Sequence, residues 1–364
     1  MALKVGRTVA GKRAVVSHTG ALAGQESAYD AAFDRCGVLR AGNTEELFDW
    51  ARALAWCPPM RGNRVAVLTN AGGPGILAVD AIEIAGARLA ALSDQTRTAL
   101  PNFLLPHASL INPIDMLASA GPKEYAEAVR ILLIDPGVDA VLVITVPPPI
   151  DDPTPIAEAI AVAGKDADKP IVVAMMGEAT VGLALKVLRA FRIPDYRFPE
   201  RAASALGALW RQAQWRARLP HRPEVLDDVD RVTARQLLTL TQGAAIGGID
   251  AAEILSAYKI LGPREAMAHS ADEAAQRAET FGYPVVLKVS SPDITHKSDV
   301  GGIALGLVDA TAVRLAFDRI IANARRVRPD ARIDGVTIQP MVLMGQEVII
   351  GAVRDEQFGP LMMF

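Results

Sequence analysis

Residues 64–86, RVAVLTNAGGPGILAVDAIEIAG, decide the fold. The apolar centre of 64–70 is typical of a buried strand, AGGPG at 71–75 predicts a loop, and 76–86 has the composition of a helix. The alternation continues, with strands predicted at 139–146 and 169–176 and helices at 123–134, 155–164, 180–190 and 200–216. Strands that are apolar throughout and alternate with helices predict an α/β domain, a doubly wound parallel sheet covered on both faces.

Before this domain, a histidine lies in a second glycine-bearing segment. We predict strands at 2–6 and 13–17 and helices near 23–35 and 44–55, with 56–59, WCPP, ending the pattern. The strand at 13–17 would then deliver His18 to a Thr19-Gly20 turn at a helix N-terminus. Free N–H groups and the helix dipole favour an anion there, so His18 is a candidate carrier of phosphate. The alternative is that His18 only packs or caps a loop.

The loop at 71–75 repeats this arrangement. Gly72, Gly73 and Gly75 would let the backbone approach a phosphate without Cβ atoms in the way. No Gly-Lys-Ser/Thr follows, so the loop is not a P-loop, and its spacing is not the G-x-G-x-x-G dinucleotide fingerprint. A tight turn is the alternative, whereas two such helix starts facing each other would hold one phosphohistidine between them.

The last third has a different character. Prolines and dense charges at 217–231 predict a linker. Beyond it we expect an amphipathic helix at 251–260, a helix at 270–282 that starts at a serine and ends at a glycine, and a helix near 310–326. Strands are predicted at 283–290, 301–308, 335–342 and 346–355, so this region is α+β.

Two charged residues of this region are candidates for nucleotide binding. Lys288 lies on an apolar strand, where a buried ammonium requires an anionic partner such as a nucleotide phosphate, although a lysine on a strand is more often solvated. Glu347 is expected on a strand, in reach of a ribose or a base amino group. His296 follows Lys288 in a polar loop. We interpret His107, His221 and His269 as structural or solvated, and Asn112 to Asp115 as a turn in which an active-site role for Asp115 stays open.

Composition narrows the classes of function. A net charge of −3 lacks the basic excess that nucleic-acid binding needs, and no apolar run is long enough to cross a membrane. No His/Cys cluster suggests zinc, and no metal-ligating residues are assigned. With only two cysteines and no recognisable signal peptide in its first residues, the chain is expected in the cytoplasm.

Six stretches together resemble the NDP-forming acyl-CoA synthetases, which are relatives of succinyl-CoA synthetase. They are SHTGALAG at 17–24, LTNAGGPGILAVDA at 68–81, NPID at 112–115, YPVVLKV at 283–289, THKSDVGGI at 295–303 and GQEVIIGAVRDEQFGP at 345–360. The resemblance implies succinyl-CoA synthetase-like, flavodoxin-type sheets followed by a partial ATP-grasp domain. It divides the chain into 1–58 with the phosphohistidine, a second such domain at 60–216, the linker, and an incomplete ATP-grasp domain at 232–364.

The implied reaction is acyl-CoA + ADP + phosphate ⇌ carboxylate + CoA + ATP. In the family the histidine matching His18 is phosphorylated, that matching His296 is proposed to ferry phosphate to the nucleotide, and Lys288 and Glu347 match nucleotide-binding positions. The expected ligands are therefore ATP or ADP, magnesium, phosphate and acyl-CoA, and an oligomer is expected for the complete protein. The family pattern also places a CoA-binding domain before this sequence and magnesium-binding acids after it, so we expect a chain truncated at both ends and inactive alone. Two rivals remain: a synthetase-like regulatory module of an acetyltransferase, and an inactive gene fragment.

Overall fold

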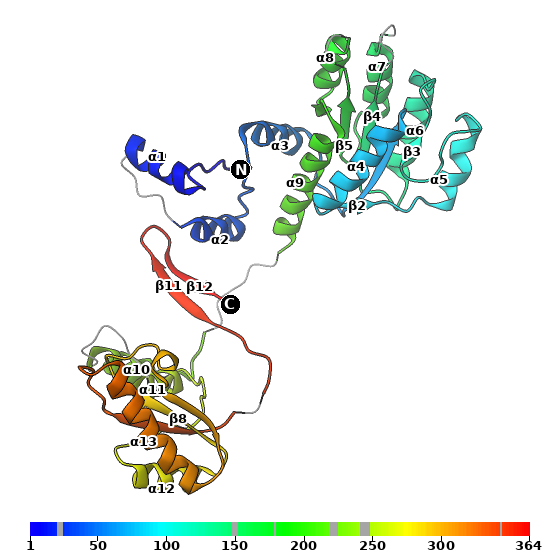
Figure 1. Ribbon diagram of the computed structural model, residues 1–364. Helices are drawn as coiled ribbons and strands as arrows, with labels where there is room; N and C mark the ends of the chain where they lie inside the picture. The colour runs from blue at the N-terminus through cyan, green and yellow to red at the C-terminus, as the bar shows by residue number, and fades with distance from the viewer. Residues whose placement is uncertain (20–24, 148–151, 178–179, 219–224, 241–247, 343) are drawn as a thin grey trace. The chain divides into compact units, whose positions relative to one another are not determined.

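The computed structural model describes residues 1–19, 25–147, 152–177, 180–218, 225–240, 248–342 and 344–364, with the backbone alone at 16–19, 248 and 249. The chain divides into two compact units (Figure 1). The first contains residues 1–220 and 349–364, and the second contains residues 221–348.

The first unit is built on a six-stranded parallel sheet. The strand order is β2-β1-β4-β5-β6, and β3 also pairs with β1. The central register sets Val67 opposite Leu142 and Leu142 opposite Val172, and all three side chains are fully buried. The strands are β1 Arg64–Thr69, β2 Arg88–Leu89, β3 Ile114–Asp115, β4 Ala140–Thr145, β5 Ile171–Met175 and β6 Asp195–Tyr196.

Helices cover both faces of this sheet (Figure 1). One face packs against α6, α7, α8 and the short η1, and the other packs against α3, α4 and α9. The predicted doubly wound α/β fold is therefore confirmed. The helices are α3 Thr44–Trp56, α4 Gly72–Ile84, α5 Asp94–Ala99, η1 Leu100–Asn102, α6 Pro122–Ile134, α7 Thr154–Ala163, α8 Gly182–Ala190 and α9 Pro199–Ala217.

The N-terminal segment differs from the prediction. Residues 13–17 belong to a helix, α1 Val9–Thr19, and not to a strand; residues 2–6 contribute only an isolated bridge between Ala2 and Arg40. The hydroxyl oxygen of Thr8 accepts a 3.0 Å hydrogen bond from the amide of Gly11, which starts α1 as an N-cap does. The next helix is α2 Glu26–Cys36, so His18 lies in the last turn of one helix and not at the start of another.

Residues 349–364 complete the first unit as a hairpin of β11 Gly351–Asp355 and β12 Gly359–Met363. Its turn is held by the Asp355 carboxylate, which accepts from the amides of Gln357 and Phe358 at 2.9 and 3.0 Å. The hydroxyl of Tyr29 on α2 donates to the Gln357 side chain at 2.7 Å. The strand predicted at 346–355 therefore begins only at Gly351, where a partner strand exists.

The second unit is α+β, as predicted. An antiparallel sheet in the order β7-β10-β8-β9 packs one face against α12 and α13, and Ser270 caps α12 by accepting from the amide of Glu273. A helix not predicted, α10 Arg231–Leu240, packs on α11 Gly248–Ala257. The other elements are β7 Ala266–Ala268, α12 Ala271–Phe281, β8 Val285–Ser290, η2 Ser298–Val300, β9 Ile303–Leu307, α13 Ala310–Val327 and β10 Gly335–Pro340.

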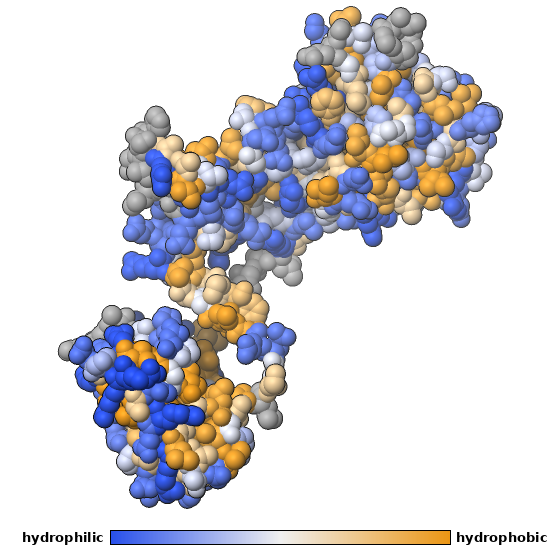
Figure 2. All heavy atoms as spheres, viewed as in Figure 1, coloured by the Kyte–Doolittle hydropathy of each residue, from blue (hydrophilic) through white to orange (hydrophobic). Residues whose placement is uncertain are grey.

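On the face shown in Figure 2, polar and apolar residues are interspersed. Within the described residues, no helix combines the length and apolarity needed to cross a bilayer.

Candidate functional site

The parallel sheet has one point where its winding changes direction. From β1 the chain crosses to β2 and β3 on one side, and β4, β5 and β6 then follow on the other side. Neighbouring crossovers diverge at such a point, and ligands of doubly wound proteins bind in the crevice at the carboxyl ends of the strands there. The N-terminus of α4, which starts three residues after Thr69, lies at this edge.

The glycines predicted to form a loop are in fact the first turn of α4. Gly72 is its first residue. Pro74 is tolerated in the first turn because a backbone nitrogen there has no acceptor within the helix, so the missing N–H of proline costs no hydrogen bond. Ala71 at the N-cap makes no side-chain hydrogen bond, and the first turn holds no acidic residue. A Cβ at Gly73 would meet nothing within 4 Å. Among the described residues, the N-cap side chain therefore leaves the first turn uncapped, and such a helix start suits an anion.

Two asparagines that sequence reasoning did not single out as anchors hold this edge in place. The Asn70 amide donates to the carbonyl of Val146 at 3.0 Å and accepts from its N–H at 2.8 Å, which joins the end of β1 to the end of β4. Asn112 accepts from Val67 and donates to the carbonyls of Val65 and Ala90. Such partners are set by strand neighbours far along the chain, so only the turn character of both residues was visible in the sequence.

Asp115 lies beside the start of α4. It forms β3 with Ile114, where the sequence predicted only a turn, and its Oδ1 accepts from the amide of Leu117 at 3.0 Å. Its Oδ2 lies 3.3 Å from the position that a Cβ on Gly72 would take. Leu117 adopts a left-handed φ of 70°, a strained conformation for a leucine. The Asp115 carboxylate thus faces the helix end from β3.

The structure places only part of the predicted histidine site. His18 has helical backbone in α1, its side chain is not described, and Gly20 lies outside the described residues. The structure therefore does not define how far the His18 side chain lies from Gly72. Three of the predicted phosphate-binding glycines, Gly72, Gly73 and Gly75, do come together at one helix end.

Lys288 lies on β8 and points to the face of the antiparallel sheet that α12 and α13 do not cover. Its neighbours Leu287 and Val289 point to the opposite, buried face. The Lys288 ammonium donates to Oε1 of Gln339 on β10 at 2.5 Å, and Oε1 of Glu265 lies 3.8 Å from it. The anionic partner expected for Lys288 is thus the Glu265 carboxylate of the same unit. The periodicity of the strand did not predict this pairing.

The two other predicted residues of this region are exposed. His296 lies in the loop after β8, where its carbonyl accepts from the amide of Asp299. Glu347 is not on a strand, because residues 346–350 have no pairing partner and the hairpin begins after them. The structure does not join Glu347 to Lys288 through any hydrogen bond or ion pair among the described residues.

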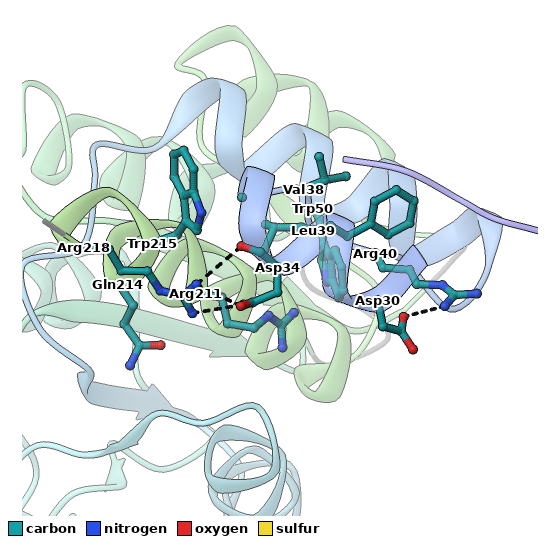
Figure 3. A pocket seen from close by; sticks show the side chains of 12 residues that line it. Asp30, Asp34, Val38, Leu39, Arg40, Trp50, Arg211, Gln214, Trp215 and Arg218 are labelled. Atoms are coloured by element: carbon teal, nitrogen blue, oxygen red, sulfur yellow. Dashed lines mark hydrogen bonds and ion pairs between the residues drawn. The ribbon is translucent and has the colours of Figure 1, made fainter. Parts of the chain in front are cut away.

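A cavity of about 630 Å³ lies elsewhere in the first unit, between α2, α3 and α9. Figure 3 shows Arg218 on its wall facing Asp34, with two hydrogen bonds of 3.0 Å between them. This pairing lowers the pKa of Asp34. Arg211 lies over the Trp50 ring at 4.7 Å, so much of the cavity's charge is already paired or stacked. None of the predicted site residues lines it.

Comparison with known protein families defines the class of this chain. Residues 1–54 match the succinyl-CoA ligase like flavodoxin domain, residues 65–220 match the Ligase-CoA domain, and residues 240–364 match the ATP-grasp domain. Three regions of the chain thus match these domain families, in the order that the sequence predicted.

Individual relatives narrow this class. The chain is 39% identical over 364 residues to acetate–CoA ligase [ADP-forming] I of Archaeoglobus fulgidus. The alignment covers 100% of this chain and 52% of that protein. In Pyrococcus furiosus, acetate–CoA ligase [ADP-forming] II is divided between two subunits. Subunit α is 42% identical over 218 residues (59% of this chain, 48% of the subunit), and subunit β is 44% identical over 126 residues (34% and 53%). The chain spans about half the length of the curated relatives it matches.

A solved structure shares the fold. It is an acetyl-coenzyme A synthetase 1 from Ca. Korarchaeum cryptofilum in complex with phosphate and ADP. That structure has a TM-score of 0.55 and 38% identity, and the match covers 59% of this chain and 47% of that one. The predicted resemblance is confirmed: all 364 residues are similar to part of an ADP-forming acetate–CoA ligase.

Proposed function

We propose that the protein carrying this chain is an ADP-forming acyl-CoA ligase that passes phosphate through His18. The similarity of all 364 residues to part of such a ligase, and the order of the three matching domain families, support this function. The observation that carries the proposal is the start of α4 at the switch point of the sheet, where the N-cap side chain makes no hydrogen bond and Gly73 leaves open space for an anion.

In the proposed cycle, phosphate displaces CoA from an acyl-CoA and gives an acyl phosphate. The neutral imidazole of His18 attacks the phosphorus, the bond between phosphorus and the carboxylate oxygen breaks, and the carboxylate leaves. ADP then takes the phosphoryl group from nitrogen, which gives ATP and regenerates the imidazole. We assign Gly20 and the glycines of α4 to hold the phosphoryl group on the histidine through backbone N–H groups.

We assign nucleotide binding to the second unit. Lys288 would contact a nucleotide phosphate from β8, Glu347 would bind the ribose or base, and His296 would carry phosphate between His18 and the nucleotide. The exposed position of His296 in the loop after β8 supports a mobile carrier better than a packed one. The domain division at 1–58, 60–216 and 232–364 belongs to the same proposal.

The ligands of the relatives set the remaining proposals. ADP and phosphate occupy the Korarchaeum structure, and we propose that this protein also binds CoA and, with the nucleotide, magnesium. Among the described residues, no group of three or more His, Cys, Asp or Glu is placed to hold a metal, so no step is assigned to magnesium here. The division of the Pyrococcus enzyme into two subunits supports an oligomer, and the free thiols of Cys36 and Cys57 fit a cytoplasmic protein.

The experiment is ATP synthesis from acetyl-CoA, ADP and phosphate by the purified full-length protein and by His18→Asn. We expect the variant to lose activity at least about a thousandfold, because no other group would carry the phosphoryl. His107→Asn, which changes a histidine outside the proposed site, is the matched control and should keep activity. Equal activity of His18→Asn and the wild-type protein would refute the proposal.

A second experiment separates the two histidines. His296→Ala should slow labelling of His18 from ATP about tenfold or more and leave its labelling from acetyl-CoA and phosphate unchanged, because only the nucleotide half needs the second carrier. Equal loss in both half-reactions would make His296 a structural residue.

A further inference from the structure

The ammonium of Lys288 is held at a defined place on the open face of the antiparallel sheet. Gln339 lies two residues along β10 from Thr337, the partner of Lys288, and the residue is only 9% exposed, so its side chain has little freedom. Its oxygen accepts from Lys288 at 2.5 Å. A lysine has three N–H donors, and this bond fixes the direction of one of them.

Glu265 provides charge without a hydrogen bond. Its carboxylate oxygen lies 3.8 Å from the ammonium nitrogen, which is beyond hydrogen-bond distance and within ion-pair distance. Its side chain is 16% exposed and that of Lys288 is 31% exposed, so the attraction is only partly screened by water. Glu265 therefore neutralises the lysine without a hydrogen bond to it, and the one hydrogen bond to Gln339 uses a single N–H donor.

We propose that Glu265 is the resting counter-ion of Lys288, and that a nucleotide phosphate replaces it when the nucleotide binds. This inference rests on the proposed nucleotide role of Lys288. Gln339 keeps the ammonium in place during the exchange, and the Glu265 carboxylate, one residue before β7, repels the incoming phosphate. Glu265 thus lowers the affinity for phosphate-bearing ligands and speeds their release, which suits a site where ADP and ATP must alternate.

The test is the dissociation constant of ADP, pyrophosphate and adenosine for the full chain, measured by titration calorimetry. Glu265→Gln keeps the shape and removes the charge, and we expect ADP and pyrophosphate to bind about two- to fivefold more tightly, as for a partly exposed ion pair. Adenosine, which has no phosphate, should bind with unchanged affinity. In a Lys288→Met background, Glu265→Gln should change the dissociation constant of pyrophosphate less, because there is then no ammonium for Glu265 to neutralise.

Glu279→Gln is the matched control. It removes the same charge from an exposed position on α12, which covers the other face of the sheet, and it should leave all three constants unchanged. If the wild-type chain binds ADP and Glu265→Gln binds it with equal or weaker affinity, this inference alone is overturned. No binding of ADP or pyrophosphate to either protein overturns both this inference and the nucleotide role of Lys288.

Discussion

The two sheets of this protein place their chemistry in different positions. The parallel sheet is covered on both faces, its central strands are wholly buried, and its candidate site lies beyond the strand ends at the start of α4. Among the described residues, the antiparallel sheet packs one face on α12 and α13, and Lys288 stands on the other, beside the buried Gln339. A doubly covered sheet leaves only its ends for a ligand, whereas a sheet covered on one side offers a whole face.

The largest expected difference between the sheets is in stability. Leu142→Ala removes a fully buried side chain at the centre of β4 and should cost about 2–5 kcal/mol of unfolding free energy. Leu305→Ala on the open face of β9, where the side chain is 64% exposed, should cost less than about 1 kcal/mol. Urea unfolding of both variants measures this. Similar costs would mean that something covers the open face.

A smaller difference concerns ion pairs. Asp139, just before β4, binds the Arg64 guanidinium at 2.7 and 2.8 Å, and this pairing holds the pKa of Asp139 below its usual value of 3.8. A lowered carboxylate pKa contributes stability above the unfolded value, and that stability is lost as pH falls through the folded value. Asp139→Asn should therefore cost about 1–2 kcal/mol at pH 7, less than a fully buried pair because Arg64 is partly exposed.

The pH dependence separates this pair from a solvated one. The cost of Asp139→Asn should decline only below pH 3.8, as the wild-type carboxyl takes up its proton. Asp334→Asn in the exposed pair with Arg332 should cost little at any pH. Chemical denaturation from pH 3 to pH 7 makes the comparison, and equal costs for the two variants would contradict it.

The smallest effect is expected at the start of α4. Gly73→Ala meets no atom within 4 Å and sits in a helix, so it should change the unfolding free energy by less than about 1 kcal/mol, in the stabilising direction. The added methyl group should nevertheless slow phosphorylation of His18, because it occupies the approach to the N–H groups. Thermal unfolding and labelling rates measure the two effects. Unchanged labelling would remove Gly73 from the site.

The structural features that could be predicted from the sequence are those that depend on neighbouring residues in the chain. The buried strands of the parallel sheet are visible as apolar runs, and Ser270 at the start of α12 is a local capping signal, so both predictions were right. Helix α1 was missed because Val15 and Val16 suggested a strand, although Thr8 stands at a capping position before it. The strand propensity of two valines is weak evidence, and the capping position of Thr8 was the better signal for a helix.

The partners of the candidate site were less predictable. Lys288 was identified from its apolar strand, but Glu265 and Gln339 reach it only through the pairing of separate strands. Glu347 was placed on a strand because its neighbours are apolar, whereas strand pairing begins only where β11 meets β12. Contacts between distant segments depend on register, which a single sequence does not contain.

The most direct measurement is the position of phosphate on the protein. The full-length protein is incubated with magnesium and labelled ATP, digested, and mapped by mass spectrometry under alkaline conditions that preserve phosphohistidine. The account predicts an acid-labile, base-stable phosphate on the peptide that contains His18, and none on that peptide in His18→Asn. Phosphate found on another residue, with the amount of label unchanged in His18→Asn, would contradict it.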